Sequence, residues 1–176
     1  MDTIPTDSAT SRPLLVDGPT PTAPYPIFAH GPVMAGFQRG SKQLGIPTAN
    51  LPQDQADHIA HSVGTGSGIY YGWASVGDSS DVWPMVMSVG WNPFFKNEKR
   101  TAEVHIIHTF HEDFYDHQLR IVVAGYIRDE KNYTSLDDLI LDIKTDIRVA
   151  EHSLARPAFA ALKEHTSLAP TPSTST

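Results

Sequence analysis

The middle of the chain alternates apolar and polar positions in short runs separated by turn residues. Runs rich in β-branched and aromatic side chains cover residues 27–35, 68–76, 83–89, 101–110 and 119–126. We expect no helix of useful length between them, which argues against a parallel, doubly wound sheet. Short strands at this spacing predict an antiparallel sheet closed as a barrel or a sandwich.

A helical repeat follows the last of these runs. Ser135 is a good N-cap residue, and Asp138 completes a capping-box-like pair with it. Pro157 ends the helix and suits the start of a short second one through Lys163. The apolar residues of the first helix fall on one stripe, at Leu136, Leu139, Ile140, Ile143, Ile147, Ala150 and Leu154.

Three segments are not expected to form strands or helices. Residues 1–26 are rich in proline, threonine and serine and predict a disordered or loosely packed arm, and residues 166–176 predict a disordered tail. Residues 53–67 are polar and end in a glycine-rich run, which indicates either a mobile lid or a solvated connector. The foldable domain is expected to span residues 27–165.

Composition limits the class of protein. A chain of 176 residues with 40% apolar content indicates one domain with one core. The net charge of −7 argues against a nucleic-acid surface, which needs clustered lysine and arginine. The absence of cysteine excludes disulfides and thiolate metal sites and fits an intracellular protein. No membrane span or secretory signal is predicted. We expect a cytoplasmic monomer, with organellar targeting by the arm left open.

A glycine-rich stretch combines backbone freedom with positive charge. Gly36, Gly40 and Gly45 surround the cations Arg39 and Lys42. Glycine lets backbone amides approach a ligand closely, so such a loop can wrap phosphate oxygens. The spacing does not match the Walker A pattern. Taken alone, a loop of this kind is more often a turn than a phosphate site.

Two neutral oxygen donors close this stretch. Thr48 and Asn50 lie two residues apart, so their side chains point to the same side of an extended segment. Such a pair suits Mg²⁺, which usually keeps water and substrate phosphates among its ligands.

An acidic residue lies within the apolar run 101–110. An unpaired carboxylate is costly to bury, so its presence in an apolar strand calls for an explanation. Glu103 could act as a general base for a substrate hydroxyl. The alternative is a side chain that points to solvent or pairs with Arg100. A zinc site is rejected, because His105 and His108 would point to opposite faces of the strand.

Further candidate binding groups lie between the last strand and the helix. Arg128, Lys131 and Tyr133 could hold a planar ligand and its phosphate, or form a solvated turn. Trp91 and Tyr115 could stack on a ring, although core packing is the better expectation for each alone. No nucleophile-elbow sequence supports hydrolase chemistry.

Several motifs occur together along residues 31–154. They are Gly36-Phe37 with Arg39-Gly-Ser-Lys-Gln-Leu-Gly-Ile-Pro-Thr-Ala-Asn50, Gly68-Ile-Tyr-Tyr-Gly-Trp-Ala74, Ser88-Val-Gly-Trp-Asn-Pro93, Glu103-Val-His105 with His108, Glu112-Asp-Phe-Tyr115, Gly125-Tyr-Ile-Arg128 and Ser135-Leu-Asp137. This set resembles the single-domain riboflavin kinases of eukaryotes, including those of fungi. The resemblance implies a mainly β fold, a small six-stranded antiparallel Greek-key barrel with a C-terminal α-helix. It also implies transfer of the ATP γ-phosphate to the 5′-hydroxyl of riboflavin, giving FMN and ADP.

The resemblance assigns roles position by position. Glu103 matches the catalytic carboxylate, and Thr48 and Asn50 match the residues that hold a divalent ion, expected to be Mg²⁺ with Zn²⁺ or Mn²⁺ as alternatives. Contacts to riboflavin are implied for Arg128, Lys131 and Tyr133. Contacts to ATP are implied for Gly36, Arg39, Gly40, Lys42, Thr48, His108 and Tyr115.

Three positions depart from the family pattern. Gln38 stands where a third closely spaced glycine is usual, Asp116 replaces a glycine, and Asp129 replaces a proline. These departures keep a second hypothesis open, a flavin- or nucleotide-binding module without catalysis. A structural barrel is a third, since fold alone does not determine function. The retained metal pair and carboxylate favour the kinase.

Overall fold

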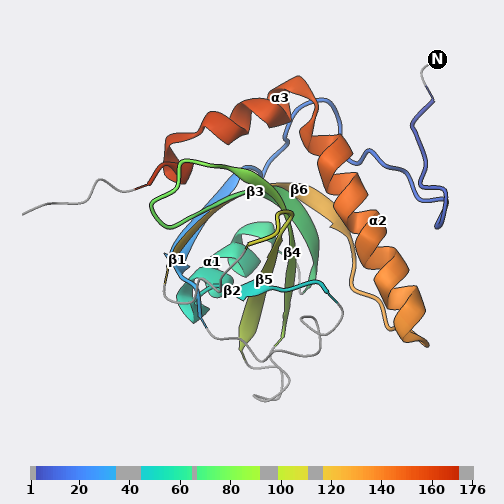
Figure 1. Cartoon of the computed structure of the whole chain (residues 1–176), viewed down its shortest axis with the longest axis horizontal. Coiled ribbons are helices and arrows are strands. Elements are labelled where there is room, and N and C mark those ends of the chain that lie inside the picture. Colours follow the sequence, from blue (N-terminus) through green and yellow to red (C-terminus); the bar gives the residue numbers. More distant parts are fainter. Residues whose placement is uncertain (1–2, 35–44, 65–66, 92–98, 111–116, 171–176) are drawn as a thin grey trace, which may run out of the picture.

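The computed structural model describes residues 3–34, 45–64, 67–91, 99–110 and 117–170 (Figure 1). Within these ranges six strands form one antiparallel sheet in the order β1-β6-β3-β4-β5-β2. Their bounds are β1 (Ile27–Pro32), β2 (Ala49–Asn50), β3 (Gly68–Val76), β4 (Trp83–Trp91), β5 (Arg100–Ile106) and β6 (Gln118–Arg128). A bridge between Met34 and Asn50 brings the two edges of the sheet together. The sheet thus curls toward a barrel, which confirms the expected fold class.

The inner face of the barrel holds the main core. Along β5 the residues Ala102, Val104 and Ile106 are buried on this face, and the intervening side chains, Glu103 and His105 among them, lie half-buried on the outer face. Alternation of this kind is the burial pattern of a strand with one face on the core. The outer face of β5 is therefore free to carry polar chemistry.

Helix α1 (Gln53–Val63) occupies the segment predicted to be a lid or a connector. That prediction was wrong in both forms. Ala56, Ile59 and Ala60 lie on one side of the helix and are buried in the barrel core, next to β1 and β5. Gly64 ends the helix with φ 69°, a left-handed conformation that glycine adopts at low cost.

Helix α2 (Leu136–Leu154) confirms the predicted C-terminal helix. The Ser135 hydroxyl accepts a hydrogen bond from the Asp138 amide at 3.1 Å, as the capping pattern predicts. A short second helix follows as expected, with α3 (Pro157–Ala160) continuing into the 3-10 helix η2 (Ala161–Glu164). Helices α2 and α3 cover the outer face of the sheet (Figure 1), where a second apolar cluster includes Tyr71, Trp73 and Phe159.

The first part of the predicted tail is folded. The 3-10 helix η3 (Thr166–Leu168) buries Leu168, which is 1% exposed. The Leu168 carbonyl accepts hydrogen bonds from Ser75 at 2.6 Å and from the buried Arg120 at 3.2 Å. A buried guanidinium needs such acceptors, so this contact draws residues 166–168 onto the barrel.

The N-terminal segment, expected to be disordered or loosely packed, runs beside α2 in its described part (Figure 1). Arg156 donates hydrogen bonds to the carbonyls of Val16 at 2.7 Å, Asp17 at 3.1 Å and Gly18 at 2.7 Å. Residues 3–26 therefore make specific contacts with the C-terminal helices. The domain boundary at residue 26 stays a prediction.

Among the helices that the structure describes, none has both the length and the apolar character needed to cross a bilayer.

Candidate active site

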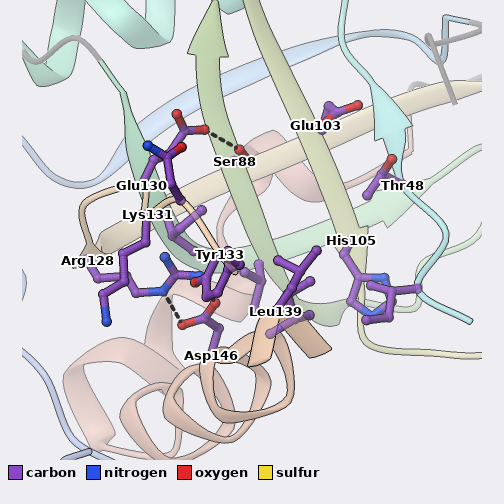
Figure 2. Close-up of a pocket in the computed structure, with 15 residues that line it drawn as sticks. Thr48, Ser88, Glu103, His105, Arg128, Glu130, Lys131, Tyr133, Leu139 and Asp146 are labelled. Carbon is purple, nitrogen blue, oxygen red and sulfur yellow. Dashed lines mark hydrogen bonds and ion pairs between the residues drawn. The ribbon is translucent and has the colours of Figure 1, made fainter. Parts of the chain in front are cut away.

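A pocket of about 510 Å³ lies between the outer face of the sheet and the first half of α2 (Figure 2). Its floor includes apolar side chains of β3 and β4, Ile69 and Val86, and α2 contributes Leu139 and Ile143. These positions lie where the helix and the sheet do not pack fully together. The size and the mixed lining are those of a site for a small organic ligand.

One wall of the pocket carries the predicted carboxylate. Glu103 of β5 lies opposite Asn50 of β2 on one side and opposite Ser88 of β4 on the other. Side chains directly opposite each other in antiparallel strands share a face. Thr48 lines the same wall, and the buried Ala49 separates it from Asn50. The oxygens of Thr48, Asn50 and Glu103 thus belong to one face of the sheet.

A hydrogen bond from β5 holds the segment that carries Thr48. The His105 ring nitrogen Nδ1 lies 2.8 Å from the carbonyl oxygen of Pro47. Because a carbonyl only accepts hydrogen bonds, Nδ1 is the protonated nitrogen. Burial lowers the pKa of His105 and outweighs this bond, which raises it, so the ring is neutral near neutral pH. The strand pattern of the sequence gives no sign of this contact between His105 and Pro47.

The opposite wall is the end of β6 and the segment that follows it (Figure 2). Arg128 donates two hydrogen bonds to Asp146 of α2, Nε to Oδ1 at 3.0 Å and Nη2 to Oδ2 at 2.8 Å. Burial alone would lower the pKa of Arg128, but the Asp146 carboxylate outweighs it and raises the pKa. The guanidinium is therefore charged and fixed in orientation.

The two other predicted flavin contacts approach a second acid of α2. Tyr133 donates its hydroxyl proton to Asp142 Oδ2 at 2.7 Å, and Lys131 Nζ lies 3.6 Å from the same oxygen. Lys131 is 56% exposed along its side chain, so this ion pair is largely solvated. Arg128, Lys131 and Tyr133 all line the pocket, so the structure brings this predicted group together.

A second carboxylate, absent from the sequence-based expectations, also lines the pocket. Glu130 accepts a hydrogen bond from Ser88 Oγ at 3.3 Å, and Figure 2 shows it on the opposite side of the pocket from Thr48. Its neighbour Asp129, one of the departures from the family pattern, accepts a hydrogen bond from the Tyr126 hydroxyl. The exposed turn after β6 gives no periodic signal from which Glu130 could have been found.

Two aromatic candidates lie away from the pocket lining. His108 is exposed and stacks on Trp83 with ring centroids 3.7 Å apart, and it is not grouped with Glu103. Trp91, expected in the core, is 42% exposed and lies under the guanidinium of Arg100 at 3.7 Å. A cation over a ring is stable at the surface, so this tryptophan does not need burial.

The remaining candidates lie outside the described residues. These are the phosphate-loop residues Gly36, Arg39, Gly40 and Lys42, the aromatic Tyr115, and the departures Gln38 and Asp116.

The wall with Thr48 is compatible with a hard divalent cation. In the described part of the chain no group of three or more histidine, cysteine or acidic side chains gathers as a metal cage. The hydroxyl of Thr48 and the amide oxygen of Asn50 nevertheless match the oxygen ligands that Mg²⁺ prefers when phosphates complete its shell.

Comparison with known proteins identifies the family. A family model described as riboflavin kinase matches residues 23–154. The mouse riboflavin kinase is 54% identical over 139 residues, covering 79% of this chain and 88% of that protein. The riboflavin kinase of Pyricularia oryzae is 50% identical over 168 residues, covering 86% and 82%. The crystal structure of riboflavin kinase from Trypanosoma brucei superposes with a TM-score of 0.62 at 28% identity, covering 78% and 85%.

These matches confirm the resemblance drawn from the motifs, and the chain belongs to the riboflavin kinase family.

Proposed function

We propose that this chain transfers the γ-phosphate of ATP to the 5′-hydroxyl of riboflavin, giving FMN and ADP. The observation that supports this most directly is the position of Glu103, on the pocket wall between Asn50 and Ser88. The relatives are named as kinases of riboflavin, which favours catalysis over an inactive flavin- or nucleotide-binding module.

The pocket suits an isoalloxazine ring and its ribityl chain. Ile69 and Val86 on the sheet and Leu139 on α2 offer apolar surface to a planar ring. Arg128, Tyr133 and the exposed Lys131 are proposed to contact the flavin from the wall that follows β6. The ribityl chain would then extend toward Glu103 on the opposite wall.

Glu103 is proposed as the residue that accepts or orients the proton of the attacking hydroxyl. The hydroxyl oxygen forms a bond to the γ-phosphorus, the bond to the β-γ bridging oxygen breaks, and the proton passes to the carboxylate. Phosphoryl transfer of this kind depends mainly on positioning and on neutralising charge. Thr48 and Asn50 would hold a divalent cation, expected to be Mg²⁺, which lowers the charge repulsion at the phosphates when bound.

The ATP contacts remain proposals from the sequence. Gly36, Arg39, Gly40 and Lys42 are proposed to wrap the phosphates, and His108 and Tyr115 to contact the nucleotide. That the enzyme is a cytoplasmic monomer likewise stays a prediction.

The test is FMN formation from riboflavin and MgATP by the purified protein, with a chelator-treated sample as control. Metal-dependent FMN formation would establish the activity. Quenching of riboflavin fluorescence without FMN would establish the binding module instead. If neither FMN formation nor fluorescence quenching is observed, only the hypothesis of a structural barrel remains.

A further inference from the structure

Helix α2 buries a polar stripe as well as an apolar one. Asp142, Thr145, Asp146 and Ser153 are all buried, at positions that lie along one side of the helix. This side does not coincide with the apolar stripe that faces the sheet. Buried polar groups are costly unless they have partners, so the stripe indicates a dedicated contact.

The partners are residues of the N-terminal arm. The Thr10 and Thr145 hydroxyls lie 3.0 Å apart, and the Val16 amide donates to Ser153 Oγ at 3.3 Å. Arg12 reaches both acids of the stripe. Its Nη1 donates to Asp142 Oδ1 at 2.9 Å and to the Asp142 carbonyl at 3.2 Å, and its Nη2 donates to Asp146 Oδ1 at 2.7 Å.

The arm presents Arg12 from a tight loop of its own. Asp7 accepts hydrogen bonds from the amides of Ala9 and Thr10, and its amide donates to the Arg12 carbonyl at 2.8 Å. Arg148 of α2 pairs with the same Asp7 carboxylate and, by this hydrogen bond, lowers the pKa of Asp7. The backbone of Arg12 is therefore held by a loop that is itself tied to α2 through Asp7 and Arg148.

The same two carboxylates hold the flavin-side wall of the pocket. Asp146 Oδ1 accepts from Arg12 and from Arg128, and its Oδ2 accepts from Arg128. Asp142 accepts from Arg12 through Oδ1 and from Tyr133 through Oδ2. Two acids of one helix thus connect the arm to the pocket wall. Each acid contacts Arg12 of the arm and a pocket-lining residue, Tyr133 for Asp142 and Arg128 for Asp146.

We propose that Arg12 is a positioning residue for the riboflavin site, acting through Asp142 and Asp146 on Arg128 and Tyr133. The inference rests on the proposed function. Arg12 precedes the residues 23–154 that match the family model, so the device belongs to an extension of this chain beyond the family core.

The charge balance explains why Arg12 is needed. Asp142 and Asp146 are separated by one helical turn, and their side chains are 12% and 2% exposed. Like charges at this spacing repel each other, and burial strengthens the repulsion. With Arg12 the two buried acids face two guanidiniums. Without it, Arg128 would be the one guanidinium that both acids share in the described part of the chain, because the second cation beside Asp142, Lys131, is largely solvated. Arg128 would then leave its orientation toward the pocket.

The test compares three variants in the full chain. Arg12→Gln removes the charge and the forked donor, and Arg12→Lys keeps the charge only. Arg156→Gln is the matched control, because Arg156 holds the arm through backbone carbonyls and touches neither acid. All three should lower the melting temperature, since each loosens the arm.

Only the Arg12 variants should weaken riboflavin use. For Arg12→Gln we expect the KM for riboflavin to rise about five- to tenfold, a typical effect within one ion-pair network, with KM for ATP and kcat within about twofold. Arg12→Lys should recover part of the loss. Hydrogen exchange at residues 128–133 should accelerate in Arg12→Gln and not in Arg156→Gln.

The outcomes separate this inference from the proposed function. If the unmodified protein makes FMN and Arg12→Gln keeps the same riboflavin KM and exchange, the positioning role is wrong and the activity stands. If the unmodified protein makes no FMN and binds no riboflavin, the proposed function fails. If, in addition, hydrogen exchange at residues 128–133 is the same in Arg12→Gln as in the unmodified protein, Arg12 does not position these residues either. Should Arg12→Gln not fold, Arg12→Lys carries the same comparison.

Discussion

Replacement of Glu103 by glutamine is the sharpest probe of the proposed chemistry. The change keeps the shape of the side chain and its place between Asn50 and Ser88, and it removes the charge and the capacity to accept a proton. Glutamine keeps one acceptor oxygen and replaces the other with an NH2 donor of similar size, so the sheet should tolerate it with little change in stability. Any loss of rate can then be assigned to the carboxylate.

The size of the loss follows from the role. A positioned general base contributes roughly 10²- to 10⁴-fold, or about 3 to 5 kcal/mol of transition-state stabilisation. Because Glu103 is only half-buried and positioning provides much of phosphoryl transfer, we expect the lower part of this range, a fall in kcat of about 10²-fold. Riboflavin affinity should change by no more than about threefold, since the apolar pocket floor and the opposite wall are intact.

The assay is steady-state FMN formation, with riboflavin binding measured separately by fluorescence quenching. Glu130→Gln is the matched control, because it removes the same charge from a second carboxylate of the pocket, one that comes from the segment after β6 and bonds to Ser88 of β4. We expect it to cost no more than a few-fold in kcat. A Glu103→Gln enzyme with more than a third of the original kcat would refute the reasoning, and so would an equal loss in Glu130→Gln.

Three further predictions concern the parts that support the site. Ile59→Ala should lower the free energy of unfolding by about 2 to 5 kcal/mol, because Ile59 is fully buried where α1 packs into the barrel core. Urea denaturation measures this loss, and a value below about 1 kcal/mol would contradict the packing. His105→Phe should remove the hydrogen bond to Pro47 that positions the neighbouring Thr48. The Mg²⁺ concentration for half-maximal rate should then rise about three- to tenfold, with riboflavin affinity retained. An unchanged Mg²⁺ dependence would show that this bond does not position Thr48. Burial raises the pKa of Asp142, but the Tyr133 hydrogen bond and the nearby cations outweigh burial and hold that pKa below its ordinary value of 3.8. A lowered pKa stabilises the folded state above the unfolded value, and this stabilisation is lost as acid protonates the group, below about pH 4. Urea midpoints at pH 7 and pH 3 should therefore differ less in Arg12→Gln than in the unmodified protein, and an equal difference would contradict the coupling.

Local periodicity was enough to predict the strand wall of the site. The alternation along β5 places Glu103 and His105 on one face whatever the rest of the chain does, and the spacing of Thr48 and Asn50 follows the same rule. Helix α2 could be predicted equally well from the sequence, because its apolar stripe runs over several turns and a serine caps it. In each case the information lies within a few neighbouring residues.

Helix α1 was not predicted, because its apolar stripe is short and the residues around it are polar or glycine-rich. Ala56, Ile59 and Ala60 are the buried positions of an eleven-residue helix whose other residues are largely polar, and a glycine-rich run follows it. Alanine carries little hydrophobic signal in a sequence, yet it fits where a helix must approach a sheet closely. Only the barrel interior, which is a tertiary feature, turns this weak stripe into a helix.

The polar stripe of α2 shows a limit of a different kind. From the sequence, Asp142 and Asp146 belong to the solvent side of an amphipathic helix, and acidic residues there need no explanation. Their burial depends on Arg12, which lies 130 and 134 residues away along the chain. No local pattern encodes such a distant partner, and a proline-rich arm is itself typical of disorder. The strand wall therefore follows from short-range alternation, whereas the wall formed by Arg128 and Tyr133 depends on ion pairs and hydrogen bonds that only the folded chain assembles. For that reason, substitutions in the arm are expected to affect the pocket without touching it.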